Sequence, residues 1–230
     1  MAIGIQRIFV EASPNYESAN RAMTFYLDIL WRRIAAAEAA SHGGAKWLDV
    51  CSGTGEMALY LHKFGGGKRN VAALDFCLPM LDSAASKHDA KLVSFSLANA
   101  TVLPFQDNSF DLVTIAFATR NINLSRKAIT ATFGEFHRVL KPGGMFLNLE
   151  TSQPESKLLK RFFHFYVDNV ARRFGQFISG SKRGYAYLSS TVRRFYTADE
   201  LAQILKEAGF KEVGFRRLML GVAAIHKALK

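Results

Sequence analysis

Short apolar runs alternate with longer amphipathic stretches through the middle of the chain. Apolar residues recur at helical spacing over 55–63, 78–87 and 125–140. Around these stretches lie apolar runs of strand length, at 47–51, 71–74, 92–97, 112–117 and 145–149. Strand alternating with helix is typical of βαβ units, in which right-handed crossovers produce a parallel sheet. The pattern therefore predicts a doubly wound α/β fold, with ligands binding beyond the carboxyl ends of the strands.

Glycine and proline mark where several predicted elements begin and end. Residues 14–40 have near-helical apolar spacing behind a proline, and Gly43-Gly44 ends that pattern. The run Lys141-Pro142-Gly143-Gly144 predicts a turn between the third helical stretch and the fifth strand.

A different pattern follows the fifth strand. Residues 154–180 are helical and aromatic in character, a polar loop is expected at 179–184, and a helix at 198–208. The closing apolar runs, 213–218 and 220–229, are expected to pair as antiparallel strands. The sequence thus predicts a mostly parallel seven-stranded sheet with an antiparallel C-terminal pair and a helical cap.

The chain has 230 residues, of which 49% are hydrophobic, and this is enough for one sizeable core. We expect a single domain over 1–230, with an N-terminal helical segment at 1–44 and a cap at 152–194. No apolar stretch is long enough to span a membrane, and the first residues do not resemble a secretory signal. Cys51 and Cys77 lack metal-ligand spacing, so the sequence predicts a reduced, cytoplasmic protein without a metal site.

Positive charge is concentrated in the predicted cap. The net charge is +11, and residues 157–194 contain one acid, Asp168, against nine basic residues: Lys157, Lys160, Arg161, Arg172, Arg173, Lys182, Arg183, Arg193 and Arg194. A solvated surface is one reading of such a cluster. Phenylalanines and a tyrosine interleave these charges, which suits the surface of an anionic membrane better than plain solvation. Nucleic acid is not expected as a partner, because no recognised nucleic-acid-binding motif is present.

An acidic residue directly precedes a glycine turn in the run LDVCSGTG (48–55). Such a turn between a strand and a helix usually holds a phosphate, because backbone N–H groups and the helix dipole attract anions. The carboxylate of Asp49 would repel a pyrophosphate and attract a ligand that carries an ammonium and a sulfonium. The turn, Ser52-Gly53-Thr54-Gly55, is therefore predicted to bind S-adenosylmethionine rather than a dinucleotide. A surface position for Asp49 would remove that preference.

Polar residues also follow the next predicted strands. Asp75 ends the second strand, where an acidic side chain can accept both hydroxyls of a ribose. Asn99 follows the third strand and could read an adenine edge with the N–H of Ala100, or could simply form a turn. Arg120 and Asn121 stand beyond the fourth strand. An arginine there could clamp a carboxylate, hold a phenolate or form a structural pair.

These residues belong to motifs that run through nearly the whole chain. The motifs are LDVCSGTGE (48–56), LDF (74–76), ANATVLPFQDNSFDLVTIAFATRN (98–121), FHRVLKPGG (136–144), LETSQPE (149–155), GYAYLSSTV (184–192) and GVAAIHKALK (221–230). With them the chain resembles the ubiquinone/menaquinone-biosynthesis C-methyltransferase family, a branch of the class I S-adenosylmethionine-dependent methyltransferases. The glycine turn and LKPGG are general to class I, whereas the block at 98–121 and the closing pattern are much narrower.

The resemblance implies roles for further residues. It implies cofactor contacts at Thr54, Asp75, Asn99, Ala100 and Ala116, with Ala116 standing where relatives often have a serine.

On the acceptor side it implies that Arg120 and Asn121 line the reacting centre. Tyr166, Tyr185 and Tyr187 fall where relatives carry tyrosines in the cap, although packing is an equal alternative for them. Of the family's N-terminal signature only Tyr16 and Asn20 remain. His164 is a candidate base or a bystander.

The resulting hypothesis is a methyltransferase that C-methylates the ring of a prenylated quinol, with Arg120 and Asn121 at the reacting centre. A class I methyltransferase acting on a phenol, an amine or a lipid headgroup is the alternative. The lipophilic acceptor implies peripheral contact with the inner face of a membrane, and homodimer formation stays open.

Overall fold

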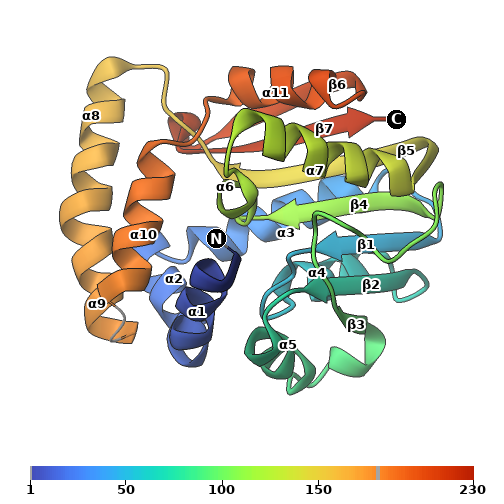
Figure 1. Cartoon of the computed structure of the whole chain (residues 1–230), viewed down its shortest axis with the longest axis horizontal. Coiled ribbons are helices and arrows are strands. Elements are labelled where there is room, and N and C mark those ends of the chain that lie inside the picture. Colours follow the sequence, from blue (N-terminus) through green and yellow to red (C-terminus); the bar gives the residue numbers. More distant parts are fainter. Residues whose placement is uncertain (1, 180–181) are drawn as a thin grey trace.

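The protein is built on one central sheet, described here from a computed structural model that covers residues 2–179 and 182–230. The seven strands lie in the order β3-β2-β1-β4-β5-β7-β6 (Figure 1). Their bounds are β1 Lys46–Val50, β2 Asn70–Asp75, β3 Ser94–Leu97, β4 Phe110–Ala116, β5 Leu140–Thr151, β6 Lys211–Leu218 and β7 Ala223–Leu229. The first five pair in parallel, and β7 is antiparallel to both β5 and β6. The predicted fold class is therefore confirmed.

Helices cover both faces of the sheet because its strands bury apolar side chains in alternation. On one face Val50, Val113 and Phe146 pack with α7 (Arg126–Val139) and α11 (Ala198–Glu207). On the other face Trp47 and Leu147 pack with α3 (Leu27–Ala40) and α4 (Glu56–Phe64). The helix α5 (Leu78–Ala85) follows β2 near the end of the sheet formed by β3. This double cover leaves the carboxyl ends of the strands as the place for a site.

The N-terminal segment contains three helices rather than the single predicted one. These are α1 (Ala2–Ala12), α2 (Tyr16–Thr24) and α3, with a short 3₁₀ turn, η1 (Ser13–Asn15), after α1. The prediction of one helix over 14–40 is wrong, because Phe25 and Tyr26 adopt positive φ angles of 51° and 62° and interrupt the helix there. Such a conformation costs a non-glycine residue ~1–2 kcal/mol and is usually adopted by glycine. Because the sequence has two aromatic residues here, it does not indicate a break in the helix.

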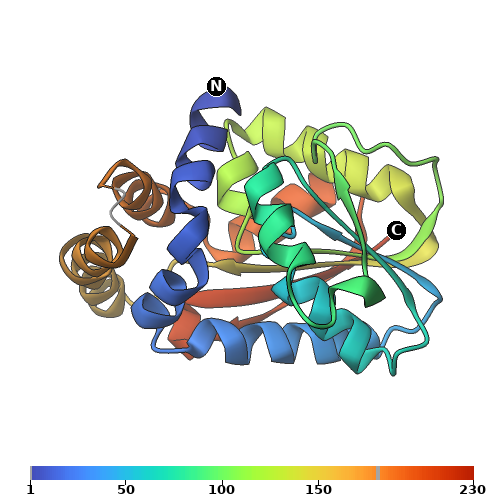
Figure 2. The same cartoon turned by 90° about the horizontal axis from the view of Figure 1, so that it is seen from below.

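The cap stands to one side of the carboxyl ends of the parallel strands (Figure 1). It contains α8 (Lys157–Tyr166), a π-helical turn η3 (Val167–Ala171), α9 (Arg172–Ser179) and α10 (Lys182–Arg193). Figure 2 shows α1 between the cap and the sheet, and α1 contacts both α10 and α5. The polar loop expected at 179–184 is wrong in its last residues, which begin α10; residues 180–181 lie outside the described part.

A smaller difference from the prediction concerns the start of β5. The predicted turn at Lys141–Gly144 is instead an irregularity inside β5, with Gly143 at φ 75° and a register shift against β4. The closing strands turn at η4 (Met219–Gly221), and the remaining short helices are η2 (Ala90–Leu92) and α6 (Thr119–Ile122). Among the described residues, no helix has the length and apolar character needed to cross a membrane.

Candidate functional site

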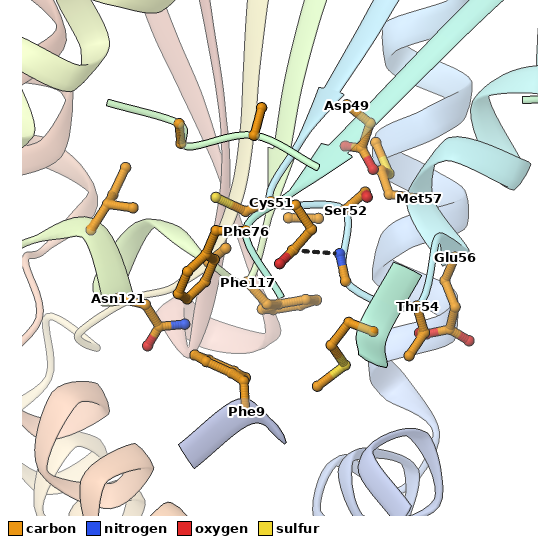
Figure 3. A pocket seen from close by; sticks show the side chains of 18 of the residues that line it. Phe9, Asp49, Cys51, Ser52, Thr54, Glu56, Met57, Phe76, Phe117 and Asn121 are labelled. Carbon is orange, nitrogen blue, oxygen red and sulfur yellow. Dashed lines mark hydrogen bonds between the residues drawn. The ribbon is translucent and has the colours of Figure 1, made fainter. Parts of the chain in front are cut away.

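A cavity of about 270 Å³ opens at the carboxyl ends of β1, β2 and β4 (Figure 3). The parallel order brings these strand ends together although they are distant in the sequence. Phe9 of α1 and Phe117, beyond β4, both point into it (Figure 3). Eight of the nine residues predicted to bind a cofactor line this cavity: Asp49, Ser52, Gly53, Thr54, Asp75, Asn99, Ala100 and Ala116. Gly55 is not among its lining residues and instead shapes the turn.

The glycine turn directs its own N–H groups inward. Gly53 N–H donates to Asp75 Oδ2 at 2.9 Å, and Gly55 N–H donates to the Ser52 carbonyl. Gly55 adopts φ 78°, and a Cβ there would lie 3.0 Å from Ala84 Cβ, so glycine is required. With these two amides already bonded, the turn does not present them to a phosphate.

Asp75 holds the turn together. Besides the bond from Gly53, its Oδ1 accepts from Cys77 N–H at 2.9 Å. Burial raises the pKa of the Asp75 carboxyl, and the N–H groups of Cys77 and Gly53 oppose that rise. Each carboxylate oxygen keeps a second lone pair, so a bond from a ribose hydroxyl remains available. The sequence predicted the ligand role and missed the structural one.

Asp49 is a buried carboxyl group with one oxygen free. It is 1% exposed, its Oδ1 accepts from Thr114 Oγ1 at 2.7 Å, and no hydrogen-bond partner is described for Oδ2. Burial raises the pKa of Asp49 to about 7, and the Thr114 hydrogen bond and Arg32 oppose this only in part. A surface position is thus excluded. An ammonium group in the cavity would both satisfy the free oxygen and favour the ionised carboxylate.

Arg32 is a site residue that the sequence reasoning missed. Its side chain is 8% exposed and binds Asp28 at 2.8 Å, with Glu56 at 3.6 Å, and its guanidinium lies 4.8 Å from the centre of the Phe117 ring. It is the only lysine or arginine among the described residues that line the cavity. The Asp28-x-x-x-Arg32 spacing signals a helical ion pair, but not that the pair faces a ligand.

The other predicted donor-side residues are placed as follows. Asn99 Oδ1 accepts from the N–H and the hydroxyl of Thr101, so Asn99 does form the turn that was its alternative reading. Its amide NH₂ stays available in the cavity wall. Ser52 Oγ is buried with no described partner, and Ala100 is buried. Burial raises the pKa of the Cys51 thiol well above its usual value, so this lining residue stays protonated.

A second cavity, of about 350 Å³, adjoins the first. Tyr16, Arg32 and Phe117 line both, so the two meet at these side chains. The second wall is largely apolar and comes from α2, α3 and the cap, with members such as Trp31 and Phe163. Asn121 lines the first cavity and Arg120 the second, which places these neighbours on the two sides of the junction.

Arg120 is held by a buried acid. Its Nη1 donates to Glu150 Oε1 at 2.6 Å, its backbone N–H donates to Oε2, and no partner is described for its Nε. Burial disfavours the Arg120 cation, but Glu150 and, more weakly, Tyr16 and Tyr187 outweigh it and raise the pKa of Arg120. The group is therefore a permanent, oriented cation in the wall of the second cavity.

The six predicted acceptor-side residues divide. Tyr16, Asn20 and Tyr166 line the second cavity, and the Tyr166 hydroxyl donates to the Met23 carbonyl. His164 and Tyr187 are not among its described lining residues. His164 Nε2 lies 2.8 Å from Gln153 Oε1, and burial, with Arg193 and Lys160, lowers the pKa of His164. The side chain of Tyr185 lies outside the described residues. Across the described chain, no group of three His, Cys, Asp or Glu residues could hold a metal ion.

Comparison with known proteins gives a consistent result over the whole chain. The model of the ubiE/COQ5 methyltransferase family matches residues 2–230. The demethylmenaquinone methyltransferase of Lactiplantibacillus plantarum is 36% identical over 230 residues, covering 98% of this chain and 95% of that protein. The ubiquinone/menaquinone biosynthesis C-methyltransferase UbiE of Desulfotalea psychrophila is 32% identical, covering 99% of this chain and 90% of that protein.

Solved structures share the fold at lower sequence identity. A SAM-dependent methyltransferase from Thermotoga maritima superposes with a TM-score of 0.65 at 16% identity, covering 96% of this chain and 99% of that one. Another from Aquifex aeolicus gives a TM-score of 0.56 at 22% identity, covering 82% and 85%. These similarities show that the chain shares its fold with these structures.

Proposed function

The chain belongs to the ubiE/COQ5 methyltransferase family and is an S-adenosylmethionine-dependent methyltransferase, and from this premise we propose that it C-methylates the ring of a prenylated quinol. Relatives named demethylmenaquinone methyltransferase make demethylmenaquinol the first acceptor to test. The predicted family, enzyme class and cofactor are thereby confirmed. The acceptor and the roles of individual residues are argued below from the two cavities.

The first cavity fits the methyl donor. We assign the free oxygen of Asp49 to the ammonium of S-adenosylmethionine, and Arg32 to its carboxylate. Asp75 is assigned to the ribose hydroxyls, and Asn99 with the Ala100 N–H to the adenine. When bound, this cofactor supplies an electrophilic methyl carbon on a sulfonium centre. Asp49 and Arg32 at the amino-acid end match the ammonium and the carboxylate of a zwitterion, which supports the assignment.

The observation that carries the acceptor assignment is the apolar second cavity with Arg120, which is paired with Glu150, in its wall. A prenylated quinol combines an apolar ring and tail with ring hydroxyls. This wall offers apolar contacts together with the Arg120 guanidinium, and Arg32 lies at the junction with the first cavity. Phe117 and Tyr16 stand at the junction, where a flat ring would approach the donor site. An amine acceptor would find no unpaired acid among the described residues of the second cavity.

In the proposed mechanism Arg120 stabilises the ring phenolate. Loss of a ring hydroxyl proton to water raises electron density at the adjacent ring carbon. That carbon would accept the methyl group as the bond between methyl and sulfur breaks, and would then lose its own hydrogen as a proton to water, which restores the aromatic ring. Arginine stays protonated, so Arg120 acts as a cation that lowers the pKa of the ring hydroxyl and not as the base. Glu150 is a positioning residue that fixes the guanidinium. Asn121, on the donor side of the junction, is assigned to orienting the ring.

The test is methyl transfer to demethylmenaquinol, compared with a panel of phenols and amines, with the product identified by mass spectrometry. A product methylated on ring carbon supports the proposal. Faster transfer to a phenol or amine oxygen or nitrogen would replace it with the broader small-molecule methyltransferase. Thermal stabilisation by S-adenosylmethionine in the same samples verifies that the donor site is intact.

We also propose that the enzyme works as a single domain at the cytoplasmic face of a membrane, where the tail of its acceptor resides. The excess of basic residues in the cap supports this location. Binding to anionic vesicles that weakens as salt rises is the expected result. Whether a homodimer forms is to be measured in the same experiments.

A further inference from the structure

The second cavity opens through a rim of exposed apolar side chains. Phe25, Phe162 and Met219 all line the cavity, yet they are 71%, 63% and 57% exposed. They come from three separate segments: the break between α2 and α3, the helix α8, and the turn η4. Large apolar residues on one exposed rim are unusual for a surface that faces only water.

The rim extends outward through the neighbours of these residues. Tyr26 is 64% exposed and Leu220 79% exposed, and neither lines the cavity. Both two-residue turns adopt positive φ angles, of 51° and 62° at Phe25 and Tyr26, and of 44° and 57° at Met219 and Leu220. Glycine or asparagine would adopt these angles with less strain. Strained turns that display large apolar side chains point to a function at the surface.

One face of the helix α8 continues the apolar rim. Leu159 and Phe163 face the cavity, and Phe162 lies next to them around the helix, at the rim. Beyond Phe162 on the same side of the helix lie the exposed Leu158 and Phe165.

Basic residues border this apolar face. Arg161 has neighbour spacing on the helix to Leu158 and Phe165, and Lys157 lies one turn before Arg161; both basic residues are exposed. Neither α8 nor α9 contains an acidic residue, and Arg172 and Arg173 of α9 are exposed as well. An apolar rim bordered by cations is complementary to an anionic bilayer, whose headgroups are negative and whose interior is apolar.

We infer that this rim, comprising Phe25-Tyr26, Met219-Leu220 and the exposed face of α8, inserts into an anionic membrane and aligns the cavity mouth with the bilayer. The inference rests on the proposed function, because it supplies the route by which a tailed acceptor enters. The reacting ring passes between the rim side chains into the cavity, while the tail stays in the lipid. The enzyme thus takes its acceptor without exposing it to water.

The variant Tyr26→Asn/Leu220→Asn tests the inference. Both positions are exposed, lie outside the cavity lining and have positive φ, so asparagine removes apolar surface without adding strain. We expect an unchanged or higher Tm, and a partition coefficient for phosphatidylglycerol-containing vesicles that is lower by about tenfold or more. The matched control is Phe64→Asn/Leu92→Asn, two exposed apolar residues near the amino ends of β2 and β3. The control is expected to bind vesicles like the wild type.

Turnover separates this inference from the proposed function. The rim variant should methylate a demethylated naphthoquinol without a tail at the wild-type rate, and should lose activity toward the long-tailed acceptor in vesicles. The inference would be overturned if the rim variant bound vesicles as tightly as the wild type. It would also be overturned if the wild type were a dimer and the rim variant a monomer, because the rim would then be the contact with a second copy. If the wild-type protein binds vesicles but methylates neither acceptor, only the proposed function is overturned.

Discussion

Replacing Asp49 by asparagine should change stability and cofactor affinity in opposite directions. Burial raises the pKa of this carboxyl from 3.8 to about 7, so an ionised Asp49 destabilises the protein without ligand. The shift is about three pKa units, each worth ~1.4 kcal/mol, which gives about 4 kcal/mol at pH 8. Asparagine keeps an oxygen that can accept the bond from Thr114 Oγ1 and removes the buried charge. We therefore expect Asp49→Asn to raise the free energy of unfolding.

The pH dependence follows from the sign of the shift. A raised folded-state pKa means that the stability contribution of Asp49 is present at pH values below 3.8 and is lost as the pH rises toward about 7. The advantage of the asparagine variant should therefore shrink from about 4 kcal/mol at pH 8 to about 2 kcal/mol at pH 5. Urea unfolding without ligand at both pH values measures this difference.

Cofactor binding should respond in the opposite way. The variant loses the charged acceptor for the ammonium, so the Kd for S-adenosylmethionine should rise by about 10- to 100-fold, the range of ~1.5–3 kcal/mol for a charge-assisted hydrogen bond. In the wild type at pH 7, binding should release protons, which calorimetry in buffers of different ionisation enthalpy detects.

The control for this prediction is Asp82→Asn, which removes the same charge from an exposed position on α5. It should leave both stability and affinity nearly unchanged. The reasoning is refuted if Asp49→Asn destabilises the ligand-free protein at pH 8, or if it binds S-adenosylmethionine like the wild type.

Three further predictions concern buried polar groups. Arg120→Ala should lower the free energy of unfolding by about 3–5 kcal/mol, because it leaves Glu150 buried without its cation. The double variant Arg120→Ala/Glu150→Gln should regain much of that free energy, as measured by urea unfolding, but should remain inactive. Asp75→Asn should destabilise the glycine turn by about 1–3 kcal/mol and weaken cofactor binding, and normal binding by calorimetry would contradict its assignment. Burial lowers the pKa of His226 from 6.5 to about 4, so the free energy of unfolding should fall by about 2 kcal/mol from pH 7.5 to pH 5. The measurement is made in the Asp49→Asn variant, because the titration of Asp49 changes stability with pH in the opposite direction. Adding His226→Gln should abolish the fall.

The donor site was largely predictable because its parts are local in the sequence. A short strand, the Gly53–Gly55 turn and the following helix form one contiguous unit, and Asp75 ends the adjacent strand. Their relative positions follow from the βαβ geometry alone. Asn99 shows the remaining ambiguity, because its side chain forms a turn and also lines the cavity.

The acceptor side was less predictable. His164, a candidate base from sequence, binds Gln153 instead of lining the second cavity's described wall. Arg32, unnoticed in the sequence, stands where both cavities meet. Of the helices that supply this side, α3 packs on the sheet, whereas α2 and the cap helices pack mainly against other helices. No strand register therefore fixes which residues of α2 and the cap face inward.

The sequence by itself determined the fold class, the methyl donor and the cationic character of the cap, because these depend on periodicity, on contiguous motifs and on composition. Tertiary structure decided what depends on distant pairs. Thr114 meets Asp49 across 65 residues and Glu150 meets Arg120 across 30, and both pairs exist only because of the strand order. The apolar rim likewise joins three segments far apart in the chain. Its exposure is set by packing and by the strained turns at Phe25-Tyr26 and Met219-Leu220, which no hydrophobic pattern encodes.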